Sequence, residues 1–114
     1  MRGIQLLVAS VALSFFGCAS TFTSAKDDLR RGDAANARLK LASIEADVAT
    51  WSISERAEYA LERGVTHLSL GDRNAATVWL TKADEMVRSN PQALSEQNRA
   101  RLKVSIETSS FPRP

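Results

Sequence analysis

The sequence predicts an all-α fold, built as a short stack of about two helical hairpins and a capping helix. Residues that start and stop helices recur along the chain after residue 24. Between these signals, apolar residues recur with the 3.6-residue period of an α-helix. Part of this pattern repeats at a spacing of 39 residues, and no window shows the apolar–polar alternation of a β-strand.

The first 25 residues carry a single charge, at Arg2, and differ sharply from the charged remainder of the chain. The 13-residue run from Ile4 to Phe16 suits the apolar region of a signal peptide and is short for a transmembrane helix. It is followed by Gly17 and Cys18, and Cys18 is the only cysteine, which excludes an internal disulfide framework. We therefore expect a signal peptide over residues 1–17.

The segment Phe15-Phe16-Gly17-Cys18 resembles the lipobox of bacterial lipoproteins, from which Phe16 departs because a small residue is usual there. The resemblance implies transfer of a diacylglyceryl group to the Cys18 sulfur, cleavage before Cys18, and acylation, as by palmitate, of the new amino terminus. A thiolate suits alkylation, and acyl chains contribute about 0.8 kcal/mol per buried CH₂ to membrane binding. Ala19 favours outer-membrane delivery, by resemblance to enteric sorting. An incidental cysteine after an ordinary signal peptide and an uncleaved anchor over residues 4–22 remain open.

The first hairpin is expected to follow a lipidated tether over residues 18–24. Ser24 and Asp27 have the spacing of a capping box, which predicts a short helix over 25–31. Gly32-Asp33 is typical of a helix stop and restart, because glycine adopts the left-handed conformation and aspartate caps the next helix. The second helix then has an apolar face formed by Ala37, Leu41, Ile44 and Val48.

The second hairpin is expected between Ser52 and Pro91. Ser52 and Glu55 have capping-box spacing, and Gly71-Asp72 repeats the stop-and-restart signal. Pro91 ends the hairpin, because the residue before a proline disfavours helical geometry. The apolar stripe of this hairpin comprises Ala57, Ala60, Leu61, Gly64, Val65, Leu68, Ala76, Leu80, Ala83 and Val87.

Identical residues occupy the turn and the core face of both hairpins. Leu29, Gly32, Asp33, Ala37, Leu41 and Val48 match Leu68, Gly71, Asp72, Ala76, Leu80 and Val87. With Gly64 at the small position where helices approach and Pro91 closing the unit, the body resembles the tetratricopeptide repeat. That resemblance implies a helix-turn-helix solenoid of about two units within a domain over 25–108. The segment 93–108 is expected to be its capping helix, and 109–114 a disordered tail.

No catalytic or metal-binding pattern is present, and the single histidine, His67, has no adjacent nucleophile or orienting carboxylate in the sequence. We therefore expect neither an enzyme nor a cofactor or metal site. The net charge of +2 argues against a nucleic-acid partner. By resemblance, the first helix of the second unit, 53–70, lines a concave groove. Tyr59, Arg63 and His67, spaced four apart, are predicted to form an exposed contact line there.

The expected function is that of a lipid-anchored adaptor or assembly factor that faces the periplasm and binds another envelope protein. The alternative is a pilot lipoprotein that escorts a secretion or motility component to the outer membrane. Self-association is a further expectation, because both ends of a short stack are open. Trp51 and Trp79 are interpreted either as packing between units or as anchors for a partner. The last helix, around Arg99 and Lys103, is the alternative interface.

Overall fold

The computed structural model describes residues 18–111, which are helical apart from short turns. An N-terminal helix covers residues 18–30, and α2 (Ala34–Ser43), α3 (Glu45–Val48), α4 (Ile53–Ser69), α5 (Arg73–Ser89), the 3₁₀ turn η1 (Pro91–Ala93) and α6 (Glu96–Ser110) follow. No strand occurs within 18–111, so the predicted all-α class is confirmed. The predicted signal peptide (1–17) and the end of the predicted tail (112–114) lie outside these residues. No helix among the described residues has the length and apolar character needed to cross a membrane.

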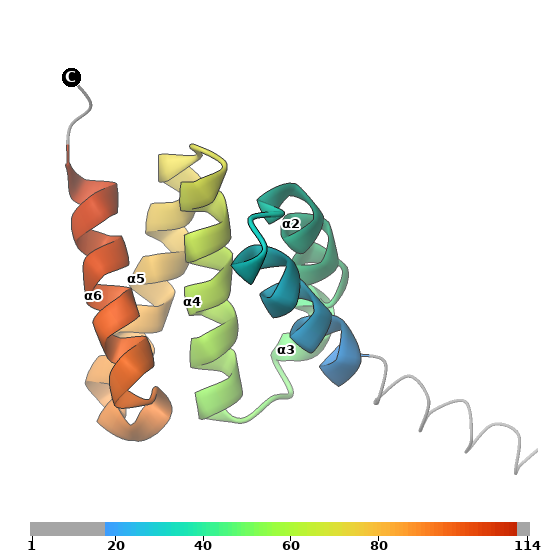
Figure 1. Cartoon of the computed structure of the whole chain (residues 1–114). Helices are drawn as coiled ribbons and strands as arrows, with labels where there is room; N and C mark the ends of the chain where they lie inside the picture. The colour runs from blue at the N-terminus through green and yellow to red at the C-terminus, as the bar shows by residue number, and fades with distance from the viewer. Residues whose placement is uncertain (1–17, 112–114) are drawn as a thin grey trace, which may run out of the picture.

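Figure 1 shows the helices side by side, with the N-terminal helix beside α2, then α4 and α5, and finally α6. The central helix is α4, which contacts α2, α5 and α6. One hydrophobic cluster, rich in small residues, joins α4, α5 and α6 around Leu61, Leu80 and Leu102. A second cluster joins the N-terminal helix and α2 to α4 around Phe22 and Tyr59.

The two hairpin turns have the same geometry, as the repeated sequence predicts. Gly32 and Gly71 adopt φ values of +84° and +78°, a region that favours glycine. Asp33 and Asp72 then cap α2 and α5, and each carboxylate accepts a hydrogen bond from the backbone amide three residues later, at 3.1 and 3.2 Å. The predicted capping box at the start of α4 is also present.

A buried carboxylate joins the two helices of the first hairpin. Asp28 of the N-terminal helix lies 2.6 Å from Lys40 of α2 and accepts a hydrogen bond from Asn36 at 2.9 Å. Arg31 pairs with its other oxygen at 2.9 Å. The hydrogen bond from Lys40 is the main cause of the lowered pKa of Asp28, so the carboxylate stays ionised inside the hairpin.

The segment 18–24 forms the first turns of the N-terminal helix, so the expected tether is wrong for this part of the chain. Phe22 is buried, with its ring centroid 6.0 Å from that of Tyr59. Ser24 lies inside the helix, and its hydroxyl accepts a hydrogen bond from Lys40 at 2.7 Å instead of capping a helix start. Burial of Phe22 therefore outweighs the local capping pattern.

The last helix begins later and ends later than the expected 93–108. Pro91–Ala93 forms a separate 3₁₀ turn, and Ser95 caps α6, which continues to Ser110. The Arg73 side chain donates hydrogen bonds to the carbonyl groups of Thr108 and Ser109, at 3.3 and 3.0 Å. These bonds satisfy carbonyl groups that a helix C-terminus leaves unpaired, which explains why the first residues of the expected tail are helical.

Gly64 of α4 lies in close contact with Leu80 of α5. A Cβ atom added at Gly64 would lie 2.6 Å from Cγ of Leu80 and would also overlap its Cδ2. Leu80 is itself buried, so it has little space into which it could move. Glycine at this position therefore sets the spacing of α4 and α5.

We predict that Gly64→Ala lowers the free energy of unfolding by about 1–3 kcal/mol through overpacking. Helix propensity alone would act in the opposite direction and stabilise the protein by about 1 kcal/mol, so the sign of the change separates the two effects. Urea unfolding followed by circular dichroism measures it. In a Leu80→Ala background the same substitution should be neutral or stabilising, and an equal loss in both backgrounds would refute the proposed contact.

Candidate functional site

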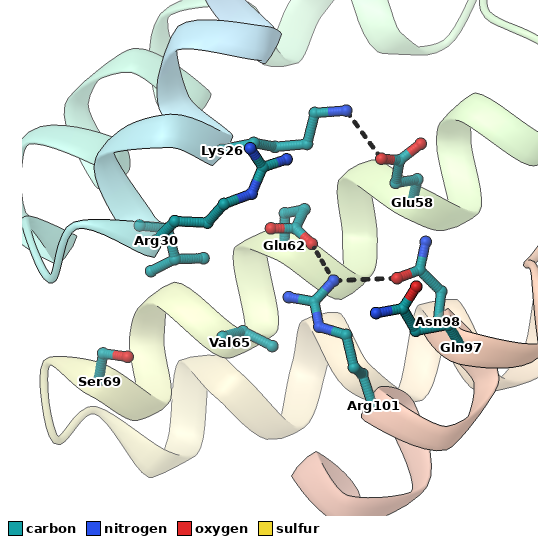
Figure 2. A pocket seen from close by; sticks show the side chains of 10 residues that line it. Lys26, Arg30, Glu58, Glu62, Val65, Ser69, Gln97, Asn98 and Arg101 are labelled. Carbon is teal, nitrogen blue, oxygen red and sulfur yellow. Dashed lines mark hydrogen bonds and ion pairs between the residues drawn. The ribbon is translucent and has the colours of Figure 1, made fainter.

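A groove of about 510 Å³ is lined by residues of the N-terminal helix, α4 and α6. Its floor is one face of α4, and Glu58, Glu62, Val65 and Ser69 point from that face into the groove in Figure 2. These positions are three or four residues apart, so they lie above one another along the helix. The two neighbouring helices supply the sides of the groove.

Ion pairs connect the floor of the groove to both sides. Lys26 of the N-terminal helix lies 2.9 Å from Oε1 of Glu58. Arg101 of α6 lies 2.6 Å from Oε1 of Glu62, and the same Arg101 nitrogen donates to Oδ1 of Asn98 at 3.0 Å (Figure 2). Glu62 is buried, and a buried carboxylate is costly unless it is paired in this way. The two pairs therefore hold four of the five charged side chains that line the groove.

The predicted contact line of Tyr59, Arg63 and His67 follows α4, but it does not face the groove. The exposed fractions of these residues are 1%, 9% and 8%. Tyr59 belongs to the hydrophobic cluster that joins the first hairpin to α4. The expectation that the three side chains form an exposed line is therefore wrong, because they lie inside the seam between the hairpins.

Within this seam, Tyr59 and Arg63 link the two hairpins by polar contacts. The Tyr59 hydroxyl donates to the carbonyl of Leu41 at 2.6 Å and accepts from Nη1 of Arg63 at 3.2 Å. Arg63 also lies 3.2 Å from Glu45, and its guanidinium stacks on the Trp79 ring, 4.5 Å from the centroid. Burial raises the pKa of Tyr59, so the hydroxyl remains a donor at neutral pH.

His67 is buried at the same seam and has no close partner for Nδ1. This nitrogen makes no hydrogen bond, and the nearest carboxylate, that of Asp72, lies 3.8 Å away. Burial is the main cause of the lowered pKa of His67, and the positive charges of Arg63 and Arg38 lower it further. His67 is therefore neutral in the folded protein at neutral pH.

Cys18 is half-buried, and its Sγ donates a hydrogen bond to Oδ2 of Asp47 at 3.2 Å. That hydrogen bond is the main cause of the raised pKa of Cys18, because it stabilises the thiol over the thiolate. In the folded protein the sulfur is accordingly a neutral thiol. Alkylation of Cys18 would remove the donor hydrogen and with it this contact.

The tryptophans pack in the seam region rather than in the groove. The ring centroids of Trp51 and Phe22 lie 5.5 Å apart, and those of Trp79 and Tyr59 lie 5.6 Å apart. Trp79 and Tyr59 also line a second cleft, of about 540 Å³, which is formed by residues of α3, α4 and α5. Inter-hairpin packing is thus observed for both rings, and Trp79 keeps a partly exposed edge.

Arg99 and Lys103, the alternative interface on the last helix, line a shallow hollow between α5 and α6, away from the groove. Within residues 18–111, no group of three or more His, Cys, Asp or Glu side chains is placed to hold a metal ion. No family model matches the chain, and neither the curated proteins nor the solved structures include a significant match.

The predicted contact line of Tyr59, Arg63 and His67 did not include Glu58 and Glu62, which form part of the groove floor. A signal for the groove exists in the repeat spacing. Gln97 and Arg101 of α6 stand 39 residues after Glu58 and Glu62, and all four line the groove. The groove residues of α4 and α6 therefore follow the same spacing as the two turns.

We predict that His67 makes stability fall as the pH drops below its ordinary pKa of 6.5. The unfolded chain takes up a proton near that value, whereas the folded protein does not because its pKa is lower. The free energy of unfolding, measured in urea between pH 6.5 and about 5.5, should therefore decrease. His67 is the only histidine, so His67→Gln should remove this slope, and an unchanged slope would contradict the assignment.

Proposed function

We propose that the chain is a lipid-anchored protein of the bacterial envelope that binds a segment of another envelope protein in its groove. It acts as a non-enzymatic adaptor or assembly factor. The observation that carries this proposal is the groove, in which the first helix of each hairpin and the capping helix α6 present charged groups, four of them held in ion pairs. Neither Cys18 nor His67 lines it, and four of its charged groups form the ion pairs Lys26–Glu58 and Arg101–Glu62, an arrangement suited to recognising polar groups.

Several features support a tetratricopeptide-like arrangement of about two units with α6 as the capping helix. The two turns share their positive-φ glycines and aspartate caps. Gly64 stands at the close approach of α4 to α5, as the resemblance implies. The groove is lined by the first helix of each hairpin and by α6, which agrees with the concave surface of such repeats.

The proposed anchor is a lipid on Cys18, in an outer membrane with the domain facing the periplasm. The lipobox-like segment supports this assignment, and the position of Cys18 in the fold is compatible with it. Cys18 is partly exposed at the start of the N-terminal helix, so an attached lipid would not have to displace the core. Phe22, four residues after Cys18, is already buried in the domain. Only a short stretch of chain therefore separates the lipid from the folded core, and the lipid would hold the domain close to the bilayer.

We predict that the wild-type protein incorporates a fatty-acid analogue in growing cells and that Cys18→Ser incorporates none. The serine hydroxyl can replace the thiol as donor to Asp47, so the fold should persist, as circular dichroism would confirm. The mutant should accumulate as an uncleaved precursor or leave the membrane fraction. A wild-type protein without label would remove the lipid anchor from the proposal.

We predict that a photocrosslinking residue at Ser69, exposed inside the groove, captures a defined partner in cells. The matched control is Val78, which is exposed on α5 and lines none of the clefts described above. Equal capture from both positions, or none from Ser69, would contradict a binding groove. If deletion of the protein displaces the captured partner from the outer membrane, the protein acts as a pilot rather than a static adaptor.

A further inference from the structure

We infer that the groove selects a partner segment rich in aspartate and glutamate side chains. This inference rests on the proposed function, because it concerns the occupant of the same groove. Two features of the groove support it: charges that remain accessible to a ligand and hydrogen-bond donors that remain unused.

The accessible charge in the groove is mainly positive. Among the cations, the side chains of Arg30, Arg101 and Lys26 are 73%, 39% and 24% exposed. The carboxylates of Glu58 and Glu62 are only 31% and 5% exposed. Since the cations outnumber the carboxylates and are on the whole more exposed, a ligand in the groove meets an excess of positive charge.

Hydrogen-bond donors in the groove also remain unused. Arg101 uses one of its guanidinium nitrogens for both Glu62 and Asn98, so its other N–H groups remain available. Asn98 gives its carbonyl oxygen to Arg101, which leaves its amide N–H groups as donors. Arg30 is held by one exposed hydrogen bond, to Asp27 at 2.9 Å, and such pairs contribute little. A ligand with many acceptor oxygens can satisfy these donors.

A basic segment fits less well. A ligand cation directed at Glu58 would approach Lys26, which already lies 2.9 Å from that carboxylate. A ligand cation directed at Glu62 would approach Arg101, at 2.6 Å from the carboxylate, and Glu62 is almost entirely covered. Each carboxylate is thus shielded by a cation of the chain itself, and a second positive charge would be repelled.

The test measures binding of fluorescent peptides to the full, detergent-solubilised protein by anisotropy. Three peptide probes share one scaffold and differ in one residue type. Serine alternates with glutamate in the first peptide, with glutamine in the second and with lysine in the third. We expect the glutamate peptide to bind most tightly and its affinity to fall as salt is raised. Equal or tighter binding of the glutamine or lysine peptide would overturn the inference.

The chain provides a closely matched control pair. Arg30 and Arg31 are neighbours with similar exposure, 73% and 71%, and each pairs with an aspartate three residues earlier at 2.9 Å. Of these two, only Arg30 lines the groove. Arg30→Gln should weaken glutamate-peptide binding about threefold, as expected for one partly screened charge contact, whereas Arg31→Gln should not. Equal effects of the two substitutions would indicate that the peptide is attracted by the net charge of the protein, and they would contradict binding in the groove.

The photocrosslink at Ser69 separates failure of this inference from failure of the proposed function. Mass spectrometry of the captured partner identifies the segment that lies in the groove. An acidic segment supports the inference, whereas a neutral or basic segment overturns it and leaves the adaptor function intact. No capture above the Val78 control overturns the function itself.

Discussion

The contact between Gly64 of α4 and Leu80 of α5 determines which neighbours the other faces of α4 can reach. Because the two helices approach so closely, α4 has one face committed to α5 and two faces left for other elements. One of these faces buries Tyr59 and Arg63 against the first hairpin. The other presents Glu58 and Glu62 to the groove. A single helix thus joins the hairpins and forms the floor of the candidate site.

The local signals in the sequence were sufficient to predict the turns and caps. Glycine at positive φ followed by a capping aspartate occurs at Gly32-Asp33 and again at Gly71-Asp72, because these conformations depend on the residues themselves. The start of the N-terminal helix could not be predicted in this way. The capping pattern at Ser24 is local, whereas burial of Phe22 depends on aromatic residues far along the chain.

The predicted contact line lies one position along α4 from the residues that line the candidate groove. Consecutive residues of a helix point about 100° apart, so the line through Tyr59 and Arg63 and the line through Glu58 and Glu62 lie on adjacent faces. An apolar stripe shows which side is buried, but not where its edge falls. Polar residues at that edge, such as Arg63, are buried only because distant partners such as Glu45 and Trp79 accommodate their charge. Glu45 lies outside the second hairpin, so the sequence of that hairpin alone could not reveal this partner.

The N-terminal helix also limits how far the groove can lie from the proposed lipid. Cys18 and Arg30 belong to the same helix, and Arg30 lines the groove. At 1.5 Å of rise per residue, the two positions are about 18 Å apart along the helix axis, and no flexible linker lies between them. The distance from the bilayer to this end of the groove is therefore bounded by the helix itself. A partner would have to expose its binding segment within this distance of the membrane surface. The protein would therefore meet its partner by diffusion along the membrane plane, in two dimensions, and not by diffusion through the whole volume.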